Sequence, residues 1–206
     1  MQESLETISK KYKSDKGAVY HNYLEIYERY FSKYRNTLTN FLEIGLWEGE
    51  SIKMWREYFN VGNLVGIDIL DLKHIKLPNT QIHICDQSDR HQLEHMISNT
   101  FDQYDIIIDD GGHMMHQQQI TLATLFKYLT PGGIFVIEDL HTSGNPSYTR
   151  INDTETLSMI SQYIKNNKIE SNCMTLEEID YLNNAIDTIH LETGNISDIA
   201  FIIKNK

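Results

Sequence analysis

The chain has 206 residues, enough for one domain with a complete core, and its 40% hydrophobic and 23% charged residues are typical of a globular protein. The net charge of -11 argues against a surface that binds nucleic acid or an anionic membrane. Cys85 and Cys173 lack metal-type spacing, so we expect them to be reduced thiols. The N-terminus has no signal-peptide core, and no apolar run approaches the about 18 residues of a membrane span, so we expect a cytoplasmic protein.

Residues 1–40 form a polar, tyrosine-rich segment, which we expect to be a helical cap on a main domain at 41–206. Aromatic and apolar residues between positions 20 and 31 repeat at helical spacing and predict an amphipathic helix. The polar stretch 13–17 just before this helix is expected to be a loop, either on the surface or folded over a ligand.

The main domain begins with a predicted strand at 41–44 and a turn that contains Gly45 and Gly49. Glycine permits a tight turn and a close approach of the backbone to a ligand. A helix is expected at 51–59, and a second strand at 63–69 contains Asp68. This acid follows Gly49 by 19 residues, the spacing at which an acid at the tip of the second strand binds ribose hydroxyls.

A third, shorter strand is predicted at 81–88 and a helix at 89–99. Two further apolar strands, at 104–109 and from residue 133 to 137, flank a helix that we expect between 115 and 129. This is a βαβ unit, so the two strands are parallel and their carboxyl ends lie at the same edge. Four acids therefore converge there, and because carboxylates repel one another they require a metal or a cationic cofactor: Asp109, Asp110, Glu138 and Asp139.

The last third of the chain is expected to contain a polar loop at 142–150 and helices at 153–165 and 176–184. Two strands, 185–191 and 198–204, are separated by only six residues. This spacing predicts a hairpin, so the sheet ends with an antiparallel pair at its edge.

The order of these features resembles the class I S-adenosylmethionine-dependent methyltransferases. Glu43, Gly45 and Gly49 are similar to the first cofactor-binding motif of that family, and Pro131-Gly132-Gly133 is similar to its usual approach to the fifth strand. Trp47 stands where the family usually has its middle glycine, which disfavours a pyrophosphate cradle but not a cofactor without phosphate. The resemblance implies a Rossmann-like α/β fold, with a mostly parallel seven-stranded sheet, helices on both faces and a C-terminal antiparallel hairpin. On this resemblance we predict cofactor contacts from Glu43, Gly45, Gly49, Ser51, Asp68, Asp86, Gln87 and Asp109.

Two groups within this family are more closely similar. Asp109-Asp110-Gly111-Gly112-His113 with Glu138-Asp139 resembles the metal-dependent sugar O-methyltransferases of the macrocin and mycinamicin type. That resemblance implies Mg²⁺ ligands at Asp110, Glu138 and Asp139, and a catalytic base at His113 working with Asp110. The N-terminal segment is similar to bacterial enzymes that methylate capsule or surface-glycan sugars, which adds Lys16, His21 and Tyr23 to the predicted cofactor contacts. The macrolide enzymes are much longer, so the identity of the acceptor does not transfer.

The chemistry of methyl transfer to a sugar explains why these residue types are needed. A sugar hydroxyl is a very weak acid, and a divalent ion bound to it lowers its pKa and orients it. Oxygen ligands suit Mg²⁺, with Mn²⁺ as a substitute, and a histidine can take the proton. We therefore predict a Mg²⁺- and S-adenosylmethionine-dependent sugar O-methyltransferase of capsule, surface-polysaccharide or glycoside biosynthesis. A homo-oligomer is expected by resemblance alone.

Several alternatives remain open at this point. His116 and His141 are rivals of His113 for the role of base, and His113 with His116 and one acid would suit zinc. The acids would otherwise simply cap the helices that follow them. The acceptor oxygen would equally be that of a phosphate or phosphoramidate group. A cofactor-binding module without turnover is the alternative from outside the enzymes.

Overall fold

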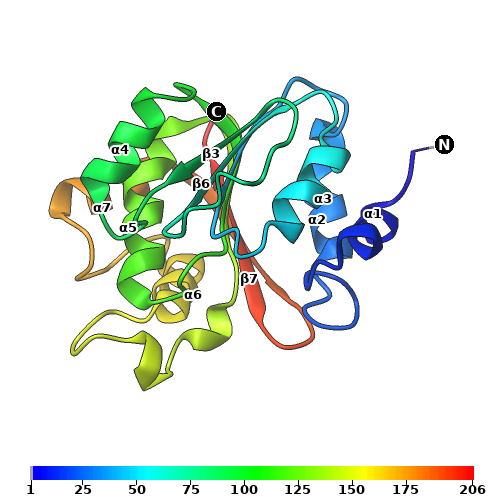
Figure 1. Cartoon of the computed structure of the whole chain (residues 1–206). Helices are drawn as coiled ribbons and strands as arrows, with labels where there is room; N and C mark the ends of the chain where they lie inside the picture. Colours follow the sequence, from blue (N-terminus) through cyan, green and yellow to red (C-terminus); the bar gives the residue numbers. More distant parts are fainter. Residues whose placement is uncertain (1) are drawn as a thin grey trace.

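The computed structural model describes residues 2–206 and is organised around one seven-stranded sheet (Figure 1). The sheet order is β3-β2-β1-β4-β5-β7-β6. The first five strands pair in parallel, and β7 is antiparallel to both β5 and β6. The strands are β1 (Asn40–Ile44), β2 (Asn63–Asp68), β3 (Thr80–Ile84), β4 (Tyr104–Asp109), β5 (Leu129–Ile137), β6 (Ile186–Thr193) and β7 (Asp198–Lys204).

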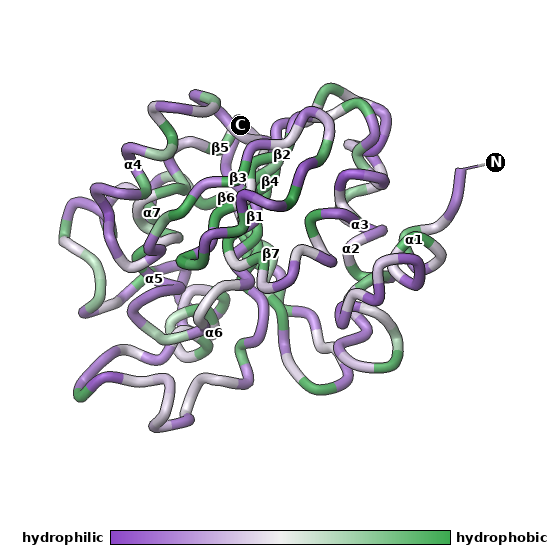
Figure 2. The backbone as a smooth tube through the Cα atoms, viewed as in Figure 1, coloured by the Kyte–Doolittle hydropathy of each residue, from purple (hydrophilic) through white to green (hydrophobic). Residues whose placement is uncertain are grey.

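Helices cover both faces of the sheet. In Figure 1, α1, α2 and α3 lie on one side, and α4 to α7 lie on the other. Figure 2 shows the apolar stretches of chain concentrated in the strands between these two layers. The helices are α1 (Leu5–Tyr12), α2 (Leu24–Phe31), α3 (Glu50–Tyr58), α4 (Arg90–Ser98), α5 (Met115–Leu125), α6 (Thr156–Asn166) and α7 (Leu176–Ala185), with short 3₁₀ turns at Ser32–Tyr34, Phe126–Tyr128, Leu140–Thr142 and Pro146–Tyr148.

The predicted fold class is confirmed, including the parallel pairing of β4 with β5 and the terminal hairpin. Strand β1 lies between β2 and β4, so the chain runs outward from it in both directions along the sheet. Such a switch in strand order leaves a crevice at the carboxyl ends of the strands, where α/β proteins bind ligands. The turn after β1 and the acids after β4 both lie at this edge.

Helix α1 is an element that we did not predict. Ser4 is its N-cap, and the Ser4 hydroxyl accepts a hydrogen bond from the backbone N–H of Thr7. Leu5 and Ile8, three positions apart, bury the inner face of the helix. The cap and this short spacing are a weak signal within a polar stretch, because a helix of eight residues depends on its packing for stability.

The predicted helix over the aromatic stripe is shorter than expected, since α2 begins at Leu24. Tyr23 and Tyr27 are nevertheless fully buried, and the Tyr27 ring packs edge-on against Trp55 of α3 at 5.1 Å between centroids. The N-terminal segment therefore contributes to the same core as the sheet. Within residues 2–206, no helix is both long and apolar enough to cross a membrane.

Candidate functional site

Strands β4 and β5 place the predicted acids next to one another. Asp109 pairs in register with Ile137, so Asp110 follows one strand while Glu138 and Asp139 follow its neighbour. The backbone N–H of Asp110 donates to the carbonyl of Ile44, and that of Glu138 donates to the carbonyl of Asp109, at 2.9 and 3.0 Å. The chain is thus still held in the sheet where the acids begin. The predicted convergence is confirmed for Asp110, Glu138 and Asp139, whereas the Asp109 carboxylate accepts from Thr121 and Gln87 instead.

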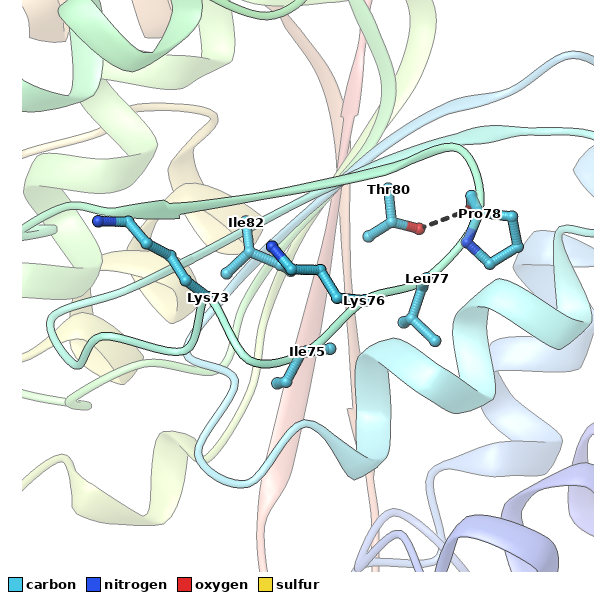
Figure 3. A pocket seen from close by; sticks show the side chains of 7 residues that line it. All are labelled: Lys73, Ile75, Lys76, Leu77, Pro78, Thr80 and Ile82. Atoms are coloured by element: carbon cyan, nitrogen blue, oxygen red, sulfur yellow. Dashed lines mark hydrogen bonds between the residues drawn. The ribbon is translucent and has the colours of Figure 1, made fainter.

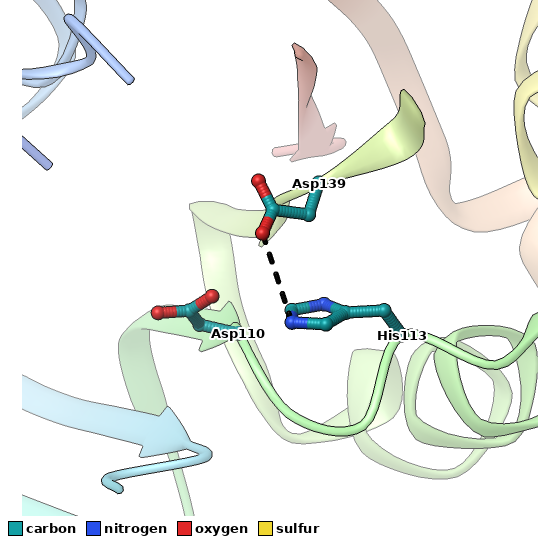
Figure 4. Close-up of side chains that lie close together, drawn as sticks. All are labelled: Asp110, His113 and Asp139. Atoms are coloured by element: carbon teal, nitrogen blue, oxygen red, sulfur yellow. Dashed lines mark ion pairs between the residues drawn. The ribbon is translucent and has the colours of Figure 1, made fainter. Parts of the chain in front are cut away.

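Asp110, His113 and Asp139 form a cluster of metal-ligand type. One ligand atom from each lies within 4.8 Å of the others. Figure 4 shows the two carboxylates near the same end of the His113 ring, whose Nε2 is 3.7 Å from Asp139 Oδ2. The other ring nitrogen, Nδ1, is buried and has no hydrogen-bond partner. The two carboxylates therefore supply oxygen ligands that fit a divalent cation, and the His113 imidazole lies beside them.

Glu138 faces a different set of partners. Its side chain is buried, and Oε1 accepts hydrogen bonds from Lys16 Nζ at 2.7 Å and from the Tyr27 hydroxyl. Burial raises the pKa of the Glu138 carboxyl well above its usual value, and repulsion from Asp110 adds to the effect, while Lys16 opposes it. Glu138 lies outside the three-residue cluster, so its role as a metal ligand stays a prediction.

Three residues of the N-terminal segment, Lys16, His21 and Tyr23, contact the acids directly. Lys16 forms ion pairs with Asp110 and Glu138, and His21 Nδ1 lies 3.3 Å from Asp139 Oδ1. The Tyr23 hydroxyl donates to the same Asp139 oxygen at 3.2 Å. Cofactor contacts of Lys16, His21 and Tyr23 remain predictions, whereas their contacts with the acids are a feature that sequence reasoning missed.

A cavity of about 760 Å³ opens beside Asp110, between the turn after β1 and the ends of β2 and β4. Five of the predicted cofactor residues line it: Gly45, Ser51, Asp68, Asp86 and Gln87. Glu43, Gly49 and Asp109 are absent from this lining, and Lys13 and Asp15 are the members of the N-terminal segment that take part. A smaller cavity, about 360 Å³, lies against β3 and is lined by none of the same residues; its polar residues Lys73, Lys76 and Thr80 are not buried (Figure 3).

The turn after β1 and the acidic loop after β4 interlock closely. Gly45 has φ +84°, and a Cβ added there would lie 2.1 Å from the carbonyl oxygen of Asp110. At Gly111 an added Cβ would lie 2.0 Å from Gln87 Oε1. Gly45 is therefore required for its backbone conformation and also for the approach of the loop that carries Asp110.

Two predicted cofactor residues hold the surrounding loops in place. Asp68 Oδ2 accepts hydrogen bonds from the backbone N–H groups of Leu46 and Trp47, at 2.8 and 3.1 Å. Gln87 donates to Asp109 Oδ1 at 3.0 Å and accepts from the N–H of Gly112 at 2.6 Å. Each side chain thus links two loops that border the cavity.

Glu43 and Asp109 are buried behind the cavity. Trp55 Nε1 donates to Glu43 Oε1 at 3.1 Å, while Oε2 of the same carboxyl is buried without a partner. Burial raises the pKa of Glu43 to about 8, although the nearby Lys16 ammonium opposes the shift. Asp109 accepts hydrogen bonds from Thr121, Gln87 and the N–H of Gly111.

The rival histidines are placed differently from His113. His116 is buried with Nδ1 3.6 Å from Asp153, and burial lowers its pKa. It does not belong to the acid cluster found among residues 2–206, so the two-histidine arrangement expected of zinc is not formed. His141 Nδ1 lies 3.9 Å from Asp139 Oδ1 and is half exposed. Of these three histidines, His113 is the one that belongs to the acid cluster.

The chain is similar in sequence to curated enzymes that methylate sugars, although no family model matches it. It is 34% identical over 151 residues to a mycinamicin VI 2''-O-methyltransferase of Micromonospora griseorubida, and 32% identical over 151 residues to a demethylmacrocin O-methyltransferase of Streptomyces fradiae. Each alignment covers 70% of this chain and 38% of the relative. The chain thus spans about two fifths of the length of these relatives.

The structure is also similar to a solved methyltransferase, MycE of the mycinamicin biosynthetic pathway, which was determined in complex with Mg and S-adenosylhomocysteine. The TM-score is 0.85 with 27% sequence identity, and the match covers 100% of this chain and 56% of MycE. A ribosomal RNA methyltransferase of Plasmodium falciparum shares the fold alone, with a TM-score of 0.57 and 13% identity.

Proposed function

Because the chain has the class I methyltransferase fold and is homologous to sugar O-methyltransferases, we propose that it transfers the methyl group of S-adenosylmethionine to a sugar hydroxyl with the help of Mg²⁺. The observation that carries this proposal is the position of the Asp110–His113–Asp139 cluster at the edge of the large cavity. Asp110 belongs to both, so a cofactor in the cavity and an acceptor at the cluster would meet there.

The cavity has the chemistry that the cofactor requires. Asp68 and Asp86 offer carboxylates at the ends of neighbouring strands, and Gly45 leaves the backbone open to close approach. The lining also contains the exposed indole of Trp47 and the apolar side chains of Ile69 and Leu70. Acidic and apolar surface together suit a cofactor that carries a sulfonium cation, a ribose and a purine. We assign the contacts of the cofactor to five residues that line the cavity, Gly45, Ser51, Asp68, Asp86 and Gln87. Glu43, Gly49 and Asp109 lie outside the lining, and we assign them the role of holding these residues in position.

The cluster has the donors that a divalent ion requires. Asp110 and Asp139 are the residues that would hold the ion, with Glu138 as the third predicted ligand. When bound, the ion supplies a lowered pKa at the acceptor hydroxyl and a fixed orientation of that group. His113 Nε2 lies 3.7 Å from Asp139 Oδ2, so the ring stands beside a predicted ligand of the ion. His113 is then the group that takes the hydroxyl proton as the oxygen attacks the methyl carbon, whose bond to sulfur breaks so that S-adenosylhomocysteine leaves.

We also propose that residues 1–40 act as a cap over the site. Lys16, His21 and Tyr23 contact the acids, and Lys13 and Asp15 border the cavity. A capsule or surface-polysaccharide sugar is the acceptor that the N-terminal motif favours, whereas the curated relatives favour a sugar on a small glycoside. In both cases the group methylated is a sugar hydroxyl.

The test is methyl transfer from labelled S-adenosylmethionine to a panel of nucleotide sugars and glycosides, with Mg²⁺ or with EDTA. We expect transfer with Mg²⁺, loss with EDTA and recovery when Mg²⁺ is restored. Transfer that is unaffected by EDTA would eliminate the metal from the mechanism. Mass spectrometry of the product distinguishes a methylated sugar oxygen from a methylated phosphate or phosphoramidate oxygen.

A further inference from the structure

Lys16 is a fully buried lysine whose ammonium group lies among the acids. It forms ion pairs with Asp110 Oδ2 and with Glu138 Oε1, the latter at 2.7 Å. A buried ammonium is costly unless it is compensated, and these two carboxylates compensate it. The two ion pairs therefore place a buried cation directly between Asp110 and Glu138.

The Lys16 ammonium and a divalent ion would compete for the same carboxylates. Asp110 is a partner of Lys16 and also a member of the cluster with His113 and Asp139. Glu138, the third predicted ligand, is the other partner of Lys16. Two cations that share carboxylates at contact distance inside a protein repel each other strongly, because little water screens them.

The position of Lys16 in the chain allows it to leave. It lies in the loop between α1 and α2, outside any helix or strand. The loop is closed by turn-type hydrogen bonds, including those from the N–H of His21 to the carbonyl of Asp15 and from the N–H of Tyr23 to the carbonyl of Lys16 itself. The neighbouring Val19 and Tyr20 are exposed, and the loop is tied to the turn between β6 and β7 by two hydrogen bonds that Asn195 donates to the carbonyls of Ala18 and His21. The flexible stem of lysine also suits a group that changes position.

We propose that Lys16 is an internal cation that stands in for the metal: it neutralises Asp110 and Glu138 when no divalent ion is bound, and binding of the ion displaces it. This inference rests on the metal site of the proposed function. Because Lys13 and Asp15 of the same loop border the cofactor cavity, displacement of Lys16 also links metal binding to the shape of that cavity.

The first test is calorimetric titration of Mg²⁺ into the wild-type chain, Lys16→Met and Lys10→Met. Lys10→Met removes the same charge from an exposed position that pairs only with Glu6 among the residues of the described chain. We expect Lys16→Met to bind Mg²⁺ at least about tenfold more tightly than wild type, because a competing cation is gone, and Lys10→Met to match wild type. Unchanged or weaker Mg²⁺ affinity in Lys16→Met, with S-adenosylhomocysteine binding intact, would overturn the displacement.

The second test needs only the wild-type chain and decides the matter if Lys16→Met does not fold. Amine-reactive labelling, mapped by mass spectrometry, measures the exposure of each lysine with EDTA and with saturating Mg²⁺. Lys16 should be labelled at least about tenfold faster with Mg²⁺, while labelling of Lys10 stays constant. A Lys16 that stays protected with Mg²⁺ bound contradicts the proposal. If every variant binds S-adenosylhomocysteine but none binds Mg²⁺, the metal site of the proposed function is wrong. If Mg²⁺ binds and Lys16 stays protected, only the displacement of Lys16 is wrong.

Discussion

Replacing Gly45 with alanine tests the interlock between the turn after β1 and the loop that carries Asp110. The backbone at Gly45 has φ +84°, which costs a residue with a Cβ about 1–2 kcal/mol. The new methyl group would also lie 2.1 Å from the Asp110 carbonyl oxygen, and overpacking of this kind costs about 1–3 kcal/mol. Gly45→Ala should therefore lower the free energy of unfolding by about 2–5 kcal/mol.

Gly132→Ala is a matched control, because Gly132 has φ +76° and a Cβ there meets no atom within 4 Å. It should lose only the conformational part, about 1–2 kcal/mol. Urea unfolding followed by circular dichroism compares the two variants, and calorimetry measures their affinity for S-adenosylhomocysteine. We expect Gly45→Ala, and not Gly132→Ala, to weaken that affinity as well. Equal losses of stability, with binding intact in both, would refute the interlock.

Three further predictions concern single side chains of the site. His113 has φ 57°, which asparagine tolerates, so His113→Asn removes the imidazole without straining the backbone. The variant should lower kcat by about 10²–10⁴, while the affinities for Mg²⁺ and S-adenosylhomocysteine stay within a few-fold. A full rate at every pH would show that His113 is not the base. Burial raises the pKa of Glu43 to about 8, so between about pH 4.5 and 8 the folded chain holds a proton that the unfolded chain has lost, and the free energy of unfolding should fall as pH rises through this window. Urea unfolding in EDTA should show a shallower fall for Glu43→Gln than for the wild type. Equal slopes would contradict the raised pKa. Trp47 borders the cavity and is 75% exposed, whereas Trp55 is buried. Binding of S-adenosylhomocysteine should therefore change the tryptophan emission of the wild-type chain but not that of Trp47→Phe. An emission change retained in Trp47→Phe would show that Trp47 does not contact the cofactor.

Much of the fold could be predicted because its signals are local. The three isoleucines of β4 mark a strand buried on both faces, and the short spacing between β6 and β7 permits only a tight connection. The convergence of Asp110 with Asp139 followed from the parallel direction of β4 and β5. These inferences require only the order of the elements along the chain.

The contacts of the N-terminal segment could not be predicted in the same way. Lys16 lies 94 residues from Asp110 and 122 from Glu138 in sequence, and no local pattern links them. Tyr27 appeared only as part of an apolar helical stripe, yet its hydroxyl donates to Glu138. In both cases the sequence indicates that the residue is present, while packing of the segment on the sheet decides which polar partner its side chain meets.

The central claim is that Asp110 and Asp139 form a divalent-metal site beside a cofactor cavity. Its most direct test is calorimetric titration of Mg²⁺ into the wild-type chain and Asp139→Asn, with S-adenosylhomocysteine bound. Asparagine accepts the left-handed backbone at this position, where φ is 56°, so the variant removes the charge and leaves the chain path intact. We predict Mg²⁺ binding to the wild type, at least about tenfold weaker binding to Asp139→Asn, and little change in affinity for S-adenosylhomocysteine. Equal Mg²⁺ binding by both proteins would contradict the account.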